Sequence, residues 1–91
     1  MIRITATTQT REEVVLKLEG WLAEGDVALL AAEGEGHLRE TERLVLELTG
    51  VEFIDSAGIE LLQAWAAKGM VLRGGSPFVQ VLLREHGLPS E

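Results

Sequence analysis

The residues best suited to chemistry in this sequence stand together in the stretch DSAG, residues 55–58. β-Forming residues end just before it, and an apolar pattern with helical spacing follows it. The spacing predicts Asp55 as a helix N-cap and places Ser56 in the first helical turn. A phosphate on a hydroxyl there would be stabilised by unpaired backbone N–H groups and by the positive end of the helix dipole. This position therefore suits phosphorylation of Ser56.

A purely structural interpretation explains most of the same residues. Asp55 caps the helix, and Ile54 and Ile59 occupy the two positions of a hydrophobic staple that sets the angle at which the chain enters the helix. Ser56 then only tolerates an early helical position. Under the functional interpretation, Ala57 and Gly58 keep the surroundings of Ser56 small enough for a partner to approach closely.

Hydrolysis is a third chemistry that the same residues suggest. Ser56 and Gly58 match the second half of a G-x-S-x-G nucleophile elbow, but Ile54 stands at the position of the first glycine. His37 and His86 are the only histidines that could act as a base, and neither has partners at metal-ligand spacing. We therefore expect no enzyme activity, no bound metal and no cofactor.

Trp21 follows a glycine just after a predicted strand, where it could fill the core or anchor a partner. Only four aromatic residues are available to fill the interior. Their scarcity favours the core for Trp21.

Length and composition indicate one globular domain that spans residues 1–91. Hydrophobic residues make up 46% of the chain and charged residues 25%. The net charge of −7 disfavours direct binding to nucleic acid, whose phosphates it repels. Without cysteine, thiol chemistry and disulfides are excluded, and no segment approaches the ~20 apolar residues of a membrane span. We expect a cytoplasmic protein that does not insert into membranes.

The first part of the chain predicts two strands and a helix that could position these residues. Alternating apolar residues predict a hairpin of strands over residues 2–6 and 14–18, with Gly20 ending the second strand. Helical spacing follows from Asp26, the expected N-cap, to residue 38. Gly34 and Gly36 predict that the second half of this helix frays or ends early.

The second part alternates strands with helices. An apolar run over residues 43–49 predicts a central strand, which Gly50 and Glu52 interrupt before residue 54. A helix over residues 59–66, a strand over 70–72 and a helix opened by Ser76 follow, and the tail 88–91 is too short for another element. The order ββαβαβα predicts an α/β fold with a mixed sheet of about four strands and three helices.

Two stretches resemble a known family. The stretch LVLELTGVEFIDSAGIELL, residues 44–62, resembles the signature of STAS domains, the fold of bacterial anti-sigma factor antagonists. The stretch GGSPFVQVLLREHGL, residues 74–88, is similar to the family's strand exit and final helix. The resemblance implies a STAS-like fold that lacks the usual last strand and helix, because the chain stops at residue 91.

The resemblance also implies a function. In such antagonists the serine at the position of Ser56 is phosphorylated by a partner serine kinase that is also an anti-sigma factor, and a PP2C-type phosphatase resets it. Asp55, Ala57 and Gly58 would line the same contact. Trp21 stands in a loop that faces the partner in the family, where Gly-Trp-Leu-Ala replaces the usual Gly-Glu-Leu-Asp.

Other STAS modules work without phosphorylation. Some short ones are accessory subunits of lipid-transporting ABC-type ATPases, and others are scaffolds in signalling assemblies. The resemblance therefore leaves a constitutive adaptor as the alternative.

Overall fold

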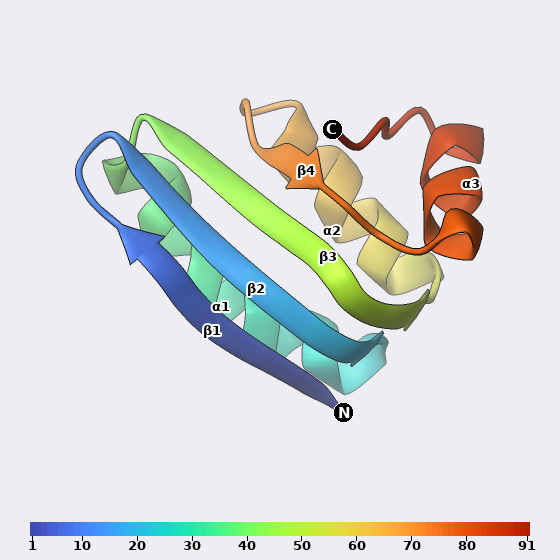
Figure 1. Ribbon diagram of the computed structural model, residues 1–91. Coiled ribbons are helices and arrows are strands. Elements are labelled where there is room, and N and C mark those ends of the chain that lie inside the picture. Colours follow the sequence, from blue (N-terminus) through green and yellow to red (C-terminus); the bar gives the residue numbers. More distant parts are fainter.

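The computed structural model describes all residues, 1–91, and contains four strands and three helices (Figure 1). In chain order these are β1 (Ile2–Gln9), β2 (Glu13–Leu22), α1 (Glu24–Glu40), β3 (Arg43–Ile54), α2 (Ser56–Ala66), β4 (Val71–Arg73) and α3 (Pro77–Glu85). The predicted α/β class and the order ββαβαβα are confirmed.

The strands form one mixed sheet in the order β1-β2-β3-β4. β1 and β2 form an antiparallel hairpin, whereas β2, β3 and β4 run parallel. Parallel neighbours need crossover connections, which α1 and α2 supply on the side of the sheet away from the viewer in Figure 1. The carboxyl ends of β2 and β3 therefore meet at one edge, and both helices begin there.

β3 is a continuous strand with two extra residues relative to β2. Lys17 pairs with Glu47, but Glu19 pairs with Gly50, and a second shift follows Gly20. Such bulges change which residues face the core, so the buried side chains Leu48, Val51 and Ile54 are spaced by three. The predicted interruption of this strand at Gly50 and Glu52 is wrong, because both lie in the bulged part of a single strand.

β2 likewise continues through Gly20 to Leu22, so the predicted end of this strand at Gly20 is wrong. Gly20 has a φ of 102°, and a Cβ there would clash with the backbone carbonyl of Met1. The same carbonyl accepts a hydrogen bond from the Trp21 N–H at 3.0 Å. Gly20 thus allows β2 to pass close to the backbone of Met1, and the strand does not end there.

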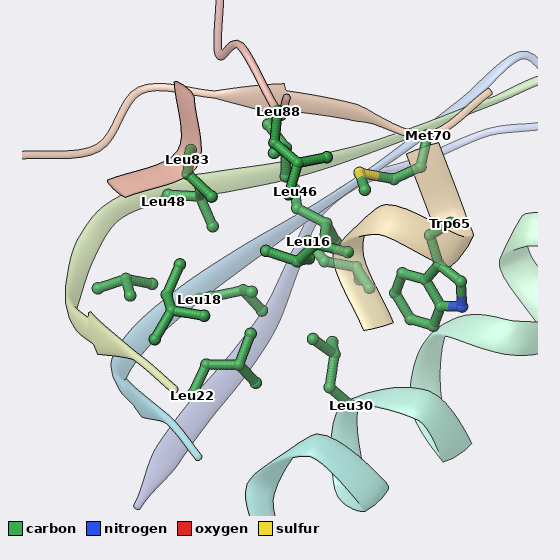
Figure 2. Close-up of a cluster of buried hydrophobic side chains, with 14 of the residues drawn as sticks. Leu16, Leu18, Leu22, Leu30, Leu46, Leu48, Trp65, Met70, Leu83 and Leu88 are labelled. Atoms are coloured by element: carbon green, nitrogen blue, oxygen red, sulfur yellow. The ribbon is translucent and has the colours of Figure 1, made fainter. Parts of the chain in front are cut away.

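The core lies between the sheet and the helices and consists mostly of leucines (Figure 2). Fully buried leucines come from β2, β3 and all three helices: Leu16, Leu18, Leu22, Leu30, Leu44, Leu46, Leu48, Leu62 and Leu83. Trp65 is the one buried aromatic, and Figure 2 shows its indole ring against α1. No helix is both long and apolar enough to cross a membrane.

α1 begins earlier and ends later than the sequence predicts. Its N-cap is Ala23, so the predicted cap at Asp26 is wrong; Asp26 lies in the first turn and pairs with the N-terminal ammonium group at 3.4 Å. The helix also passes both glycines without fraying and reaches Glu40. Gly34 has a packing reason, because a Cβ there would overlap the indole ring of Trp65. Burial of that ring against α1 offsets the low helix propensity of glycine.

Residues 88–91 form no further helix or strand, as predicted. Glu91 nevertheless lies beside β4. Its N–H donates to the Leu72 carbonyl at 2.8 Å, and its carbonyl accepts from the Gly74 N–H at 3.0 Å. The Glu91 carboxylate also pairs with Arg43 at 3.3 Å. Glu91 thus makes the backbone bonds of a parallel strand on the outer side of β4.

The face of the sheet away from the core carries a row of alternating charges. Lys17, Glu47 and Arg73 are register partners across β2, β3 and β4. The pKa of Glu47 lies below its usual value because the Thr49 hydroxyl and N–H donate to its carboxylate, and because Lys17 and Arg73 are positively charged. The charged form of Glu47 is therefore favoured in the folded protein.

The two glycines of α1 allow a matched test of the close packing at Trp65. Gly34→Ala should destabilise the protein by about 1–3 kcal/mol, because the new methyl group overpacks the contact with the indole ring. Gly36→Ala should instead stabilise it by up to about 1 kcal/mol, because nothing lies near its Cβ position. Urea unfolding measures both. Equal effects of the two substitutions would contradict the packing explanation.

Glu47 should make stability depend on pH in the acid range. Its folded pKa lies below the unfolded value of 4.5, so its contribution is present above pH 4.5 and is lost as pH falls through the folded pKa. The difference in unfolding free energy between the native protein and Glu47→Gln should therefore shrink as the pH is lowered below 4.5. A difference that stays constant over this range would show that the pKa of Glu47 is not lowered.

Candidate functional site

Asp55 connects both helices that begin at the carboxyl edge of β2 and β3. Its Oδ1 accepts a hydrogen bond from the Gly58 N–H at 2.8 Å, which caps α2 as the sequence predicts. Its Oδ2 accepts from the Glu24 N–H, the first residue of α1, at 3.0 Å. The Asp55 N–H in turn donates to the Leu22 carbonyl at 3.0 Å. One side chain thus satisfies a backbone donor in each of two helices.

The second cap could not be predicted from local sequence. Ala23, the N-cap residue of α1, has no side-chain acceptor, so this helix depends on a residue 31 positions away. The parallel register that places Leu22 beside Ile54 brings the two helix starts together. The side chains of Leu22 and Ile54 are both buried, and they pack the ends of β2 and β3 against the core.

Ser56 is the exposed position of this turn. It is the first residue of α2, and the Ile59 N–H donates to the Asp55 carbonyl at 2.9 Å to close the first helical turn. The N–H groups of Ser56 and Ala57 have no acceptor within the chain. The hydroxyl of Ser56 therefore lies beside two free backbone donors at the positive end of a helix.

Gly58 is buried, although the resemblance implies that it lines the contact with the partner. A Cβ at Gly58 would lie 2.8 Å from the Ile54 Cγ2 and 3.0 Å from the Leu22 carbonyl oxygen. Glycine is therefore required by the close approach of α2 to the strand ends. Ala57 is half-buried. Ser56 is thus the residue that presents this turn to solvent.

Trp21 is exposed, so the prediction that it fills the core is wrong. The residue is 53% exposed, and its indole ring packs edge-on against Phe53, with ring centroids 5.9 Å apart. Its Nε1–H donates to the Glu52 carboxylate at 3.2 Å. Sequence reasoning missed Phe53 as a surface residue, because the bulge in β3 decides which way this side chain points.

The remaining candidate residues do not join this site. His37 lies in α1 and His86 follows α3, and neither hydrogen-bonds to Ser56. No group of three or more histidine, aspartate or glutamate side chains is arranged to hold a metal ion. The arrangement around Ser56 lacks the hydrogen-bonded base that nucleophilic catalysis by serine uses.

Comparison with known proteins identifies the family of the chain. A family model described as "Mlab, STAS domain" matches residues 5–89, which is nearly the whole chain. The chain belongs to the STAS domain family. No curated protein matches it.

Solved structures show the same STAS fold. The anti-sigma factor antagonist SpoIIAA in its unphosphorylated form is 22% identical with a TM-score of 0.81, over 94% of this chain and 82% of that one. The phosphorylated form of the Bacillus cell fate determinant SpoIIAA is 21% identical with a TM-score of 0.75, over 94% and 85%. An anti-sigma factor antagonist from Mycobacterium paratuberculosis is 23% identical with a TM-score of 0.65, over 100% and 87%.

The double cap predicts an unusually large effect of a single aspartate in this STAS domain. Asp55→Ala removes acceptors from two helices and should lower the free energy of unfolding by about 2 kcal/mol. Ser76→Ala is the matched control, because Ser76 caps only α3 through the Val79 N–H at 3.2 Å, and it should cost about 1 kcal/mol. Urea unfolding compares the two. If both variants lose the same free energy, the bond to Glu24 contributes nothing.

Proposed function

We propose that this STAS domain is a phosphorylatable switch of the anti-sigma factor antagonist type. Ser56 is the phospho-acceptor, and the turn Asp55–Gly58 binds a partner serine kinase that is also an anti-sigma factor. A PP2C-type phosphatase removes the phosphate. The protein is a single cytoplasmic domain, and the chemistry of ATP belongs to the kinase, so this chain acts as substrate and binding module and not as an enzyme.

The observation that carries the proposal is that Ser56 is exposed in the first turn of α2, where two backbone N–H groups are unpaired. These donors and the helix dipole favour a phosphate at this position. The Asp55 carboxylate opposes it, because both of its oxygens are already engaged and its negative charge lies next door. A dianion added here changes the charge of a segment, residues 44–67, that contains no lysine or arginine, which suits a reversible switch.

Asp55 has a supporting role in this proposal. Because its carboxylate caps both helices, it holds the backbone of the turn in one conformation for the kinase. Gly58 allows the turn to lie against the strand ends. Ala57 and Ser56 then provide the surface that the partner contacts.

A constitutive adaptor, such as a subunit of a lipid-transporting ABC-type complex or of a signalling assembly, is the alternative. Trp21 favours it, because an exposed aromatic side chain stands where the antagonists that this chain resembles carry acids. An adaptor would bind its partner regardless of the state of Ser56.

Phosphorylation at Ser56 can be tested with the partner recovered by affinity purification from the source organism. Incubation of the purified pair with ATP should place phosphate on Ser56 alone, as mapped by mass spectrometry, with Ser76 and Ser90 as internal controls. Ser56→Asp should weaken binding roughly tenfold or more, which corresponds to about 1.4 kcal/mol, whereas Ser56→Ala should bind normally.

The adaptor alternative gives the opposite pattern. Both Ser56 variants would then bind as the native protein does, no phosphate would appear, and reversal of an exposed charge on α2, Glu60→Arg, would weaken the complex. That combination would rule out the switch.

A further inference from the structure

Three of the four aromatic side chains of this small protein lie at its surface. Trp21, Phe53 and Phe78 have exposures of 53%, 39% and 57%, and only Trp65 is buried in the core. Trp21 and Phe53 contact each other, with an interplanar angle of 62°, whereas Phe78 lies in α3 and is not part of this pair. The exposed pair is called the aromatic pair below. Paired aromatic side chains at a surface are typical of binding sites.

The bulge at Glu52 creates the aromatic pair. Gly20 pairs with Val51, and without an extra residue Trp21 would pair with Glu52; instead it pairs with Phe53. The next partners along both strands, Leu22 and Ile54, are buried. Side chains alternate along a strand, so the aromatic pair lies on the face of the sheet away from the core.

The aromatic pair is held in place before any partner binds. The Trp21 indole donates to the Glu52 carboxylate at 3.2 Å and packs edge-on against Phe53. Its own backbone N–H is bonded to the Met1 carbonyl. A side chain that is already ordered loses less conformational entropy on binding.

The surroundings of the aromatic pair are acidic. Residues 18–38 and 44–67, which carry the aromatic pair and both helix starts, contain no lysine or arginine. The positive groups nearby belong to the start of the chain: Arg3 is the register partner of Glu19, and the N-terminal ammonium group pairs with Asp26. The Glu52 carboxylate accepts a hydrogen bond from Trp21, and the Asp55 carboxylate, two residues beyond Phe53, accepts one from the backbone N–H of Glu24. With a net charge of −7, a second copy of this chain would be repelled at this surface.

We propose that the aromatic pair anchors a partner protein that offers an apolar pocket ringed by lysine and arginine side chains. This inference rests on the proposed function, since the same partner would contact Ser56 at the neighbouring helix start. The aromatic rings supply most of the binding energy, as buried aromatic anchors do at interfaces. The acidic rim orients the partner and accelerates association.

The experiment measures affinity for the partner purified in the Ser56 test, by isothermal titration calorimetry. Trp21→Ala and Phe53→Ala should each weaken binding roughly tenfold or more. Phe78→Ala is the matched control, an equally exposed aromatic residue outside the pair, and should change affinity by less than about threefold. Urea unfolding of each variant confirms that an exposed substitution leaves the fold intact.

A salt series tests the basic rim. Association of the native protein should slow roughly tenfold between 50 mM and 500 mM salt, because rim charges act mainly on the association rate. Glu52→Gln should reduce this salt dependence. An association rate that does not change with salt would overturn the assignment of a basic partner.

Three results would overturn the anchor. The first is that Trp21→Ala and Phe53→Ala bind the partner as tightly as the native protein does. The second is that Phe78→Ala weakens binding as much as Trp21→Ala does. The third is that the native protein forms a dimer that Trp21→Ala dissociates. Loss of binding in Ser56→Asp together with normal binding in Trp21→Ala would reject the anchor and leave the switch intact. The reverse pattern would reject the switch and leave the aromatic pair as the anchor of the constitutive adaptor.

Discussion

The carboxylate of Asp55 is the interaction on which this end of the molecule depends. α1 and α2 both begin where the parallel strands β2 and β3 end, and each leaves backbone N–H groups unpaired. The Asp55 carboxylate accepts a hydrogen bond from one N–H group of each helix, Glu24 of α1 at 3.0 Å and Gly58 of α2 at 2.8 Å. Its negative charge therefore faces two positive helix ends. Because Ala23 cannot cap α1 itself, the carboxylate links two crossovers that are distant in sequence.

The same arrangement separates residues that hold the fold from one that does not within four positions. Asp55 and Gly58 are committed to the fold, one by its two hydrogen bonds and the other by its close approach to Ile54 and Leu22. Ser56 has no comparable task and faces solvent. The hydrogen bonds that cap both helices and the close approach to the strand ends are made by Asp55 and Gly58, and Ser56 takes no part in them.

Much of the fold and part of the candidate site could be predicted, because these features depend on residues that are close together in the chain. Apolar periodicity located every strand and helix in order, and local spacing identified Asp55 as the cap of α2. The errors arose where distant segments meet. Gly34 was expected to weaken α1, yet it accommodates Trp65 from α2, and Trp21 was expected in the core, yet a bulge in the neighbouring strand leaves it at the surface.

The sequence by itself therefore determined the order of elements, the N-cap of α2 and the place of Ser56 in its first turn. These follow from side-chain periodicity and capping, which act over a few residues. Only the tertiary structure decided that Asp55 also caps α1 and that Gly58 is buried. It also decided that Trp21 and Phe53 meet at the surface. Strand register and bulges set these contacts, and both are properties of two chain segments together.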